Sequence, residues 1–164
     1  TVDGSGNVTA KAPGRTKITV TSAENSSYQA SCTVTVPYNI TYKLNKGKNN
    51  ASNPSTYYGK KITLKNPSRK GYTFAGWNTQ PDGKGTFYEE NAYVKNLTKK
   101  ADEVVTLYAQ WKAAQYQITY NLNGGKNNKK NPKTYKITSK TIKLRQKKGM
   151  CLKDGIVIKN VPKR

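Results

Sequence analysis

The sequence contains no histidine among its 164 residues, and acidic residues are scarce, with 8 Asp and Glu against 30 Lys and Arg. Without an imidazole, the chain has neither the base of a Ser-His-Asp triad nor the commonest zinc ligand. The neighbouring carboxylates of Glu89 and Glu90 would point to opposite faces of a strand. These absences predict that the chain is not an enzyme and that it holds no metal or cofactor.

Cysteine and long apolar runs are also scarce. The two cysteines, Cys32 and Cys151, have the spacing of neither a zinc site nor a redox motif. Cys32 alternates with Val34 and Val36, so we expect it to be a small core residue. No apolar run approaches the roughly 18 residues that a membrane span needs. The chain opens on Thr1 rather than on Met, which predicts a segment of a longer protein.

What the sequence has in excess is lysine. The net charge of +22 divides into +1 for residues 1–36, +8 for residues 37–112 and +13 for residues 113–164. Such a charge favours polyanions, namely nucleic acid, anionic lipid or anionic cell-wall polymers. A solvated lysine-rich surface without a specific partner explains the same composition, and both interpretations stay open.

Apolar residues alternate with polar ones in six segments, which is typical of half-buried strands. Turn residues such as those of "DGSGN", "NPS" and "PDGKG" separate them, and no segment has a sustained helical period. Residues 89–103 could hold one helical turn, although Asn and Thr interrupt it. The sequence therefore predicts a mainly β chain, with strands in 16–22, 31–36, 39–45, 60–65, 71–77 and 104–111.

The first 36 residues predict a turn at "DGSGN", a short strand at "VTAKA", and a hairpin of "RTKITVTS" with "ASCTVTV". This order resembles the C-terminal half of a group 2 bacterial Ig-like domain, whose earlier strands have no counterpart here. A hairpin by itself is marginally stable in water. The resemblance implies partial β-sandwich strands that need partners.

A repeat dominates the rest of the chain. Ile40-Thr41-Tyr42 recurs as Ile118-Thr119-Tyr120, and Asn53-Pro54 recurs as Asn131-Pro132, at a constant offset of 78 positions. The phrase "KKITL" aligns with "KTIKL" after a small insertion. Repeats of this size indicate tandem modules.

The phrases "ITYKLN", "RKGYTFAGWNTQPDGKG" and "VTLYAQW" follow one another in the first copy. In this order they resemble the internalin-type B repeat, also called the Listeria–Bacteroides repeat, over essentially all of residues 38–112. The resemblance implies a compact β-grasp-like module. It also implies a repeated extracellular part of a bacterial surface protein, with relatives implicated in adhesion or host signalling.

The second copy lacks the "GYTFAGW" phrase, and its tail reads "RQKKGMCLKDGIVIKNVPKR" instead. When the tail is written in A/T-rich codons, another frame that starts in the Gln146 codon reads KKGYVFKGW. The missing phrase thus reappears with its aromatic and glycine spacing intact. We interpret the residues from about Arg145 onward as a frameshifted repeat, and we expect no cooperative structure there.

The aromatic residues are divided between a core and a surface. We expect the core of the first copy to contain Ile40, Tyr42, Leu64, Tyr72, Phe74, Trp77, Leu107 and Trp111. The candidates for surface binding are Tyr57, Tyr58, Tyr88 and Tyr93. In "PDGKG", Gly83 and Gly85 are available for the positive φ angles of a hairpin turn.

Together these features predict tandem small modules. Residues 1–36 would be the C-terminal strands of an Ig-like domain, 37–112 a complete β-grasp-like repeat, 113–144 an incomplete second repeat, and 145–164 the frameshifted tail. The expected function is that of a non-catalytic stalk or adhesion segment, extracellular, at a bacterial surface or secreted. Its expected partners are anionic cell-wall or host-surface polymers or a host protein. A lysine-rich nucleic-acid-binding module is the alternative, although no nucleic-acid motif supports it.

Overall fold

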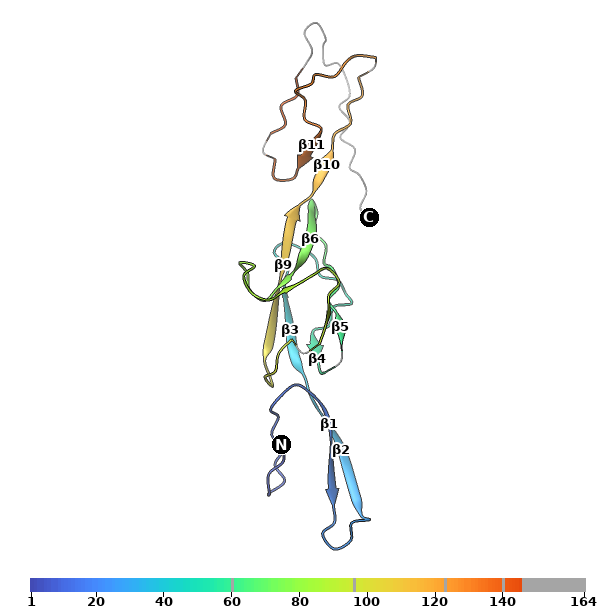
Figure 1. Cartoon of the computed structure of the whole chain (residues 1–164), viewed down its shortest axis with the longest axis vertical. Coiled ribbons are helices and arrows are strands. Elements are labelled where there is room, and N and C mark those ends of the chain that lie inside the picture. The colour runs from blue at the N-terminus through green and yellow to red at the C-terminus, as the bar shows by residue number, and fades with distance from the viewer. Residues whose placement is uncertain (60, 96, 123, 140, 146–164) are drawn as a thin grey trace. The chain divides into compact units, whose positions relative to one another are not determined.

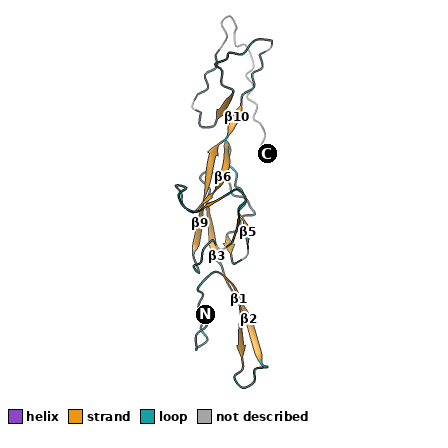
Figure 2. Cartoon of the chain, in the orientation of Figure 1, coloured by secondary structure: helices purple, strands orange, loops and turns teal. Residues whose placement is uncertain are grey.

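The computed structural model describes residues 1–59, 61–95, 97–122, 124–139 and 141–145 (Figure 1). The chain divides into two compact units. The first comprises Thr1–Arg69 and Phe74–Trp111, and the second comprises Lys70–Thr73 and Lys112–Arg164. The described residues form strands, turns and loops without a helix, so the expected mainly β fold is confirmed (Figure 2).

The N-terminal part is a hairpin of β1 (Gly14–Thr21) and β2 (Gln29–Val36), antiparallel from Gly14↔Val36 to Thr21↔Gln29. The expected strand at "VTAKA" is reduced to a single bridge between Val2 and Val8. The expectation of a core position for Cys32 is wrong, because its side chain is exposed. Among the described strands none but β1 pairs with β2.

The first repeat is built on a five-stranded sheet in the order β4-β3-β9-β6-β7. Its central pair is parallel and joins the first and last strands of the repeat, with Ile40 opposite Val105 and Tyr42 opposite Leu107. The strands are β3 (Tyr38–Lys43), β4 (Thr56–Tyr57), β6 (Tyr72–Asn78), β7 (Phe87–Tyr88) and β9 (Val104–Ala113). A second sheet pairs β5 (Ile62–Thr63) with β8 (Tyr93–Val94).

Residues 89–103, which could have held a helical turn, contain β8 and turns instead. Thr63 lies opposite Tyr93 in the small sheet, and Leu64 N–H donates to the carbonyl of Ala92 at 2.8 Å. The pairing of Tyr93-Val94 with β5 satisfies backbone groups that a single helical turn would leave without partners.

Aromatic rings form the centre of the first repeat. The rings of Tyr42 and Trp77 are 5.1 Å apart, those of Trp77 and Phe74 5.2 Å, and those of Phe74 and Trp111 5.4 Å, all tilted or edge to face. Such geometries suit the aromatic quadrupole. The buried cluster around them contains Tyr38, Ile40, Tyr57, Leu64, Phe74, Trp77, Val94, Val105, Leu107 and Ala109.

The residues that the sequence assigned to the core lie as follows. The structure buries Ile40, Leu64, Phe74, Trp77 and Leu107, and it packs the half-buried Tyr42 and Trp111 against them. Tyr72 is half-buried and lies outside this cluster. Tyr72 is two residues from Phe74, but the first residues of β6 belong to the other compact unit, which explains why alternation alone misplaces it.

Two glycines allow the rings to approach the backbone. Gly76 has φ +138°, and a Cβ there would lie 2.4 Å from the ring of Phe87. Its conformation interrupts the alternation of β6, so that Phe74 and Trp77 enter the same cluster although they are three residues apart. A Cβ on Gly47 would lie 2.6 Å from the ring of Trp111, whose indole N–H donates to Leu44 O at 2.9 Å.

The second repeat reproduces the first pair of strands of the first. β10 (Gln115–Gln117) pairs with β11 (Thr134–Lys136), with Tyr116 opposite Tyr135, just as Tyr38 lies opposite Tyr57. The tyrosine ring centroids are 5.1 Å apart in the second repeat and 5.0 Å apart in the first. Residues 78 positions apart in the sequence therefore occupy equivalent places in the two strand pairs.

A hydrogen-bond motif, which we name the Asn clip, also occurs in both copies. In the first, the side chain of Asn53 donates to Asn49 Oδ1 and Lys65 O and accepts from Lys65 N–H, at 2.8, 2.9 and 2.7 Å. In the second, Asn131 makes the same three bonds, at 2.8, 3.1 and 2.6 Å, to Asn127 and Arg145. Arg145 thus takes the place of Lys65 at an offset of 80, which gives the insertion as two residues.

The structure therefore places Arg145 in the second repeat rather than in the tail, since its backbone completes the second Asn clip. Residues 146–164, to which the frameshift interpretation applies, lie outside the described residues.

Candidate functional site

The four tyrosines that the sequence proposed for surface binding lie in different environments. Tyr93 and Tyr58 are exposed, by 67% and 39%. Tyr88 is half-buried against the core, and burial raises its pKa. Tyr57 is a correction to the prediction, because its side chain is 4% exposed and packs edge to face on Tyr38. Tyr57 is buried because β4 pairs with β3, which places its ring against Tyr38. The residues next to Tyr57 in the sequence do not indicate this pairing, since β3 lies about 20 positions earlier.

Two exposed aromatics of the first repeat, Phe87 and Tyr93, line one shallow hollow, which we name the 87–97 hollow. It is lined by residues 87–95 and Leu97. Phe87 and Tyr93, which are 51% and 67% exposed, supply aromatic surface, and Glu89, Glu90 and Lys95 supply charge. Phe87 was not among the candidates from sequence, because strand alternation does not distinguish an exposed ring from a buried one.

A turn and two asparagines shape the wall of this hollow. Ala92 N–H donates to Glu89 O at 3.1 Å, and Asn91 adopts φ 54°, a conformation that asparagine tolerates. Asn66 fixes the turn from outside, since its amide donates to Glu90 Oε2 at 3.1 Å and its oxygen accepts from Asn91 N–H at 3.0 Å. These bonds hold Glu90 beside the hollow.

The exposed ring of Tyr93 carries a cation on one face, because Lys61 Nζ lies 5.3 Å from its centroid. Cation–π contacts at exposed sites contribute roughly 0.5–1 kcal/mol. An open aromatic surface with carboxylates and amides beside it can stack on a flat apolar face and accept hydrogen bonds. This chemistry suits weak binding of a sugar ring or a peptide side chain.

The loop that carries "PDGKG" joins β6 to β7 and is ordered by one buried side chain. Asn78 is fully buried and donates to Gly83 O and Gly85 O, while its oxygen accepts from Gln80 N–H and Gly85 N–H. Gly83 has the expected positive φ of 80°. Gly85 is needed for space instead, because its Cβ would lie 2.3 Å from Thr79 Oγ1.

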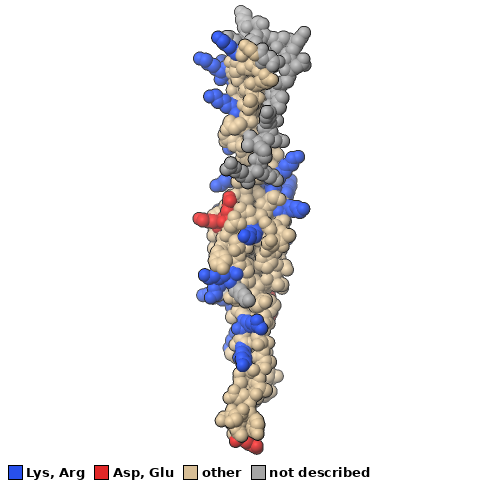
Figure 3. Space-filling view, turned by 90° about the vertical axis from the view of Figure 1, so that its right-hand side faces the viewer, with Lys and Arg blue, Asp and Glu red and all other residues tan. Residues whose placement is uncertain are grey.

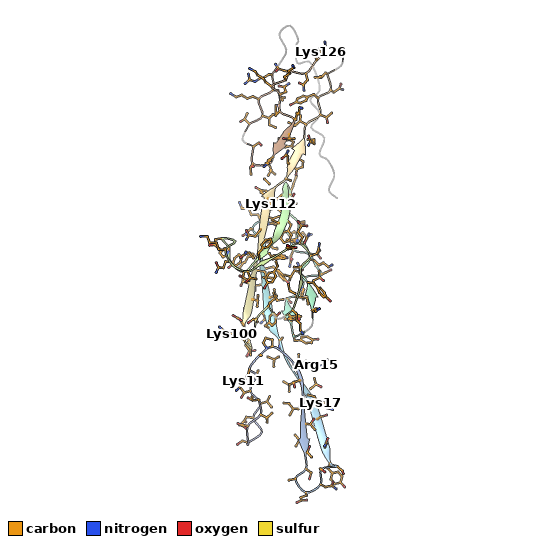
Figure 4. All side chains as sticks on the ribbon, viewed as in Figure 1. Lys11, Arg15, Lys17, Lys100, Lys112 and Lys126 are labelled. Carbon is orange, nitrogen blue, oxygen red and sulfur yellow. The ribbon has the colours of Figure 1, made fainter. Side chains whose placement is uncertain are left out.

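The lysines are a second candidate for binding. On the face drawn in Figure 3, basic side chains are scattered rather than gathered into one patch. Among the basic residues labelled in Figure 4, Arg15 and Lys17 lie on β1 and Lys112 on β9, whereas Lys11, Lys100 and Lys126 lie outside the strands. Scattered charge of this kind attracts a polyanion without selecting one. Within the described ranges no group of three His, Cys, Asp or Glu residues could hold a metal ion.

A compact repeat with a central parallel strand pair and a lysine-rich surface defines a small β module. Residues 38–110 match the sequence model of the Listeria-Bacteroides repeat domain, and residues 1–34 match that of the group 2 bacterial Ig-like domain. The middle of the chain thus matches a Listeria-Bacteroides repeat and its N-terminal part a bacterial Ig-like domain, as the sequence predicted. Both are families of non-catalytic repeat modules of surface proteins.

Two curated proteins of Evansella cellulosilytica share segments with this chain. A proposed Gly-rich membrane protein is 46% identical over 57 residues, which cover 35% of this chain. A proposed membrane protein is 46% identical over 43 residues, or 26% of this chain. The matched segment spans about 6% of the length of each relative. In the described part of this chain, no helix has the length and apolar character of a membrane span. No solved structure matches the chain.

Proposed function

We propose that the chain is an extracellular segment of a bacterial surface protein, in which its modules act as a stalk and bind anionic surface polymers weakly and repeatedly. The observation that carries this proposal is the succession of two surface-protein module families in one lysine-rich chain. The membrane-type names of the two relatives agree with a surface-associated parent protein.

The binding would come from charge, and its strength from repetition. Exposed lysines attract an anionic polymer without fixing its geometry, so each module binds weakly. When modules repeat along one chain, the second contact becomes intramolecular and the overall affinity exceeds that of one module. The 87–97 hollow adds stacking surface for the sugar or peptide part of the ligand.

The test compares two sets of exposed lysines. One variant changes Lys126, Lys129, Lys130 and Lys133 to Gln in the second repeat, and a matched variant changes Lys84, Lys95, Lys99 and Lys100 to Gln in the first. Binding to purified teichoic-type polymer is measured at 50 and 200 mM salt. We expect weak binding that salt suppresses, and a larger loss in the first variant because residues 113–164 carry +13 of the charge.

The nucleic-acid alternative is tested by competition between the same polymer and duplex DNA. Preferential binding of DNA would favour the alternative. Equal losses of polymer binding in the two lysine variants would show that binding does not depend mainly on the charge of the second repeat. A third variant, Phe87→Ala with Tyr93→Ala, isolates the 87–97 hollow. If that variant lost most of the binding while the lysine variants kept theirs, a specific aromatic site would replace the charge mechanism.

A further inference from the structure

The 87–97 hollow differs from the rest of the chain in its charge. The whole sequence has 8 acidic residues and 30 basic ones. The residues that line the hollow include two glutamates, Glu89 and Glu90, and one lysine, Lys95. All three side chains are exposed. The lining of the hollow thus reverses the balance of charge that dominates the chain.

The strands of the first repeat hold the two exposed rings of the hollow in place. Phe87 lies opposite Asn78 in the pairing of β6 with β7, and its ring occupies the space that a Cβ on Gly76 would need. Tyr93 lies opposite Thr63 in the small sheet. Because both rings are positioned before a ligand arrives, binding to them costs little side-chain entropy.

One carboxylate of the hollow is held in place as well. Asn66 Nδ2 donates to Glu90 Oε2 at 3.1 Å, and Asn66 Oδ1 accepts from Asn91 N–H at 3.0 Å. Among the described residues, none donates a hydrogen bond to Glu90 Oε1 or to the carboxylate of Glu89. These oxygens are therefore available to a donor that enters the hollow.

A contact within the chain shows that the ring of Tyr93 accepts an ammonium group. Lys61 Nζ lies 5.3 Å from the centroid of this ring. A cation over an aromatic face is attracted by the negative charge of that face, and a carboxylate nearby adds a charge-assisted hydrogen bond. Lys61 is exposed and has a flexible four-carbon stem, so an external cation can take its place.

We propose that the 87–97 hollow is a binding site for a sugar that carries a free amino group. The sugar ring would lay its apolar C–H face on the rings of Phe87 and Tyr93. Its ammonium group would donate to the carboxylates of Glu89 and Glu90. The inference does not depend on the proposed binding of anionic polymers, since the two ligands have opposite charge.

The open shape of the hollow favours a rigid cation over a lysine side chain. Two rings in a shallow hollow do not enclose a flexible chain, which would lose much of its rotamer freedom when held there. An amino sugar presents its apolar face and its ammonium group in one fixed geometry. A neutral sugar would use the same rings but would form only neutral hydrogen bonds, which are weaker than charge-assisted ones.

The test uses the full chain and two matched oligosaccharides, a hexamer of glucosamine and a hexamer of N-acetylglucosamine. Binding is followed through the NMR shifts of the backbone amides, at about pH 6, where both the amines and the glutamates are charged. We expect the amides of 87–95 to shift, and the glucosamine hexamer to bind about tenfold more tightly than the acetylated one. General electrostatic attraction cannot produce this result, because a net charge of +22 repels a cationic ligand.

Two charge-matched variants locate the binding. Glu89→Gln with Glu90→Gln should weaken the binding of the glucosamine hexamer by about tenfold and leave that of the acetylated hexamer unchanged. Glutamine keeps an oxygen for the bond from Asn66, so the turn is preserved. Asp82→Asn with Asp102→Asn removes the same charge from exposed positions outside the hollow and should change the affinity by less than about twofold.

A third variant should act in the opposite direction. Lys61→Gln removes the cation that competes for the ring of Tyr93, so we expect the glucosamine hexamer to bind about two- to fivefold more tightly. Damage to the fold would weaken binding, so a gain in affinity reports on the hollow itself. Loss of affinity in Lys61→Gln would contradict the proposed place of the ammonium group.

Four further results would overturn the proposal. Unshifted amides in 87–95 would show that the hexamer does not bind in the hollow. Equal affinity for the two hexamers would make the hollow a platform for neutral sugars. Equal weakening by the Asp82 and Asp102 substitutions would assign the effect to long-range charge. Tighter binding of hexalysine than of the glucosamine hexamer would make a peptide the occupant. None of these results affects the proposed function, because the polymer assay uses an anionic ligand.

Discussion

The first and second repeats have the same opening and different cores. Both pair a tyrosine on their first strand with a tyrosine on their second, with ring centroids 5.0 and 5.1 Å apart. Both close an Asn clip with matching bonds. Yet the first repeat buries Tyr38, Tyr57 and Leu64, and the second leaves their counterparts half-buried.

This difference separates two sources of structure. The strand pair and the Asn clip connect residues that are at most about 20 positions apart, and they form in either repeat because those residues are present in both. The core of the first repeat depends on residues much later in the chain, since Trp111 reaches Leu44 across 67 positions. A module can therefore keep its local hydrogen bonds while its apolar face stays partly uncovered.

Restoration of the reading frame should have the largest effect, because it would remove the difference in burial between the two repeats. One base is added or removed near the Arg145 codon so that the tail reads KKGYVFKGW, and a strand equivalent to "VTLYAQW" is appended. The second repeat should then bury Tyr116 and Tyr135 and unfold as a cooperative unit, which calorimetry would register as an additional transition. If the tail codons do not encode KKGYVFKGW in an alternate frame, the frameshift interpretation is wrong.

Loss of the buried indole of Trp77 should remove the additional stability that its core gives the first repeat. Trp77 is fully buried between Tyr42 and Phe74, and we expect Trp77→Ala to cost about 3–5 kcal/mol, enough to unfold a module this small. Denaturant unfolding followed by circular dichroism measures the loss. The exposed Tyr93→Ala is the control and should cost less than about 1 kcal/mol. A Trp77→Ala variant that unfolds at the wild-type midpoint would place the core elsewhere.

The Asn clip allows a matched comparison of the two copies. Asn53→Ala removes three hydrogen bonds from the first repeat, and because the two bonds to Lys65 are exposed we expect a cost of about 0.5–1.5 kcal/mol, the net contribution of a typical hydrogen bond. Asn131→Ala should leave the unfolding midpoint of the first repeat unchanged and should speed exchange of the Arg145 amide. Equal effects of both substitutions on that midpoint would show that the two repeats unfold as one cooperative unit.

The contact between Gly47 and Trp111 allows a second matched comparison of the two repeats. Gly47→Ala places a methyl group 2.6 Å from the Trp111 ring, so we expect a cost of about 1–3 kcal/mol from overpacking. Gly125→Ala is the corresponding change in the second repeat, where the chain has no tryptophan to meet it. Unfolding midpoints of the two variants measure the difference. A Gly47→Ala variant as stable as wild type would mean that Trp111 moves away without loss.

Alkaline pH should weaken the first repeat by a smaller amount. Burial raises the pKa of Tyr38 to about 12 from its ordinary value of 10.0. The folded state therefore holds a proton that the unfolded state has lost, and stability falls as the pH rises from about 10 to 12. Unfolding midpoints at pH 8, 10 and 11 measure the slope. Burial also raises the pKa of Tyr42 and Tyr88, so Tyr38→Phe should reduce that slope without abolishing it, and an unchanged slope would mean that these other groups cause it.

Much of the fold could be predicted from the amino-acid order. Alternation located the five long strands β1, β2, β3, β6 and β9 and the short β5, and the phrases around Trp77 and Trp111 predicted the family whose sequence model matches residues 38–110. The repeat of Asn53-Pro54 at Asn131-Pro132 predicted a second module, and the Asn clips give that repeat a physical cause. These features are local, so adjacent residues suffice to encode them.

Prediction failed where a residue's environment depends on distant segments. Tyr57 and Tyr93 look alike in sequence, but the pairing of β3 with β4 buries one and leaves the other exposed. Cys32 alternates like a core residue and is exposed, since no described strand covers it. Asn78 gave no obvious signal, although its buried amide organises the whole "PDGKG" loop.

The sequence by itself determined the mainly β character, the repeat and its offset, the lysine excess and the absence of imidazole chemistry. It did so because composition and short-range alternation fix which backbone states and which side-chain chemistry are available. Tertiary structure alone decided that β3 and β9 pair in parallel and that Gly76 turns Trp77 toward Phe74. Burial and edge pairing are properties of two segments that meet in space, so neither segment encodes them without the other.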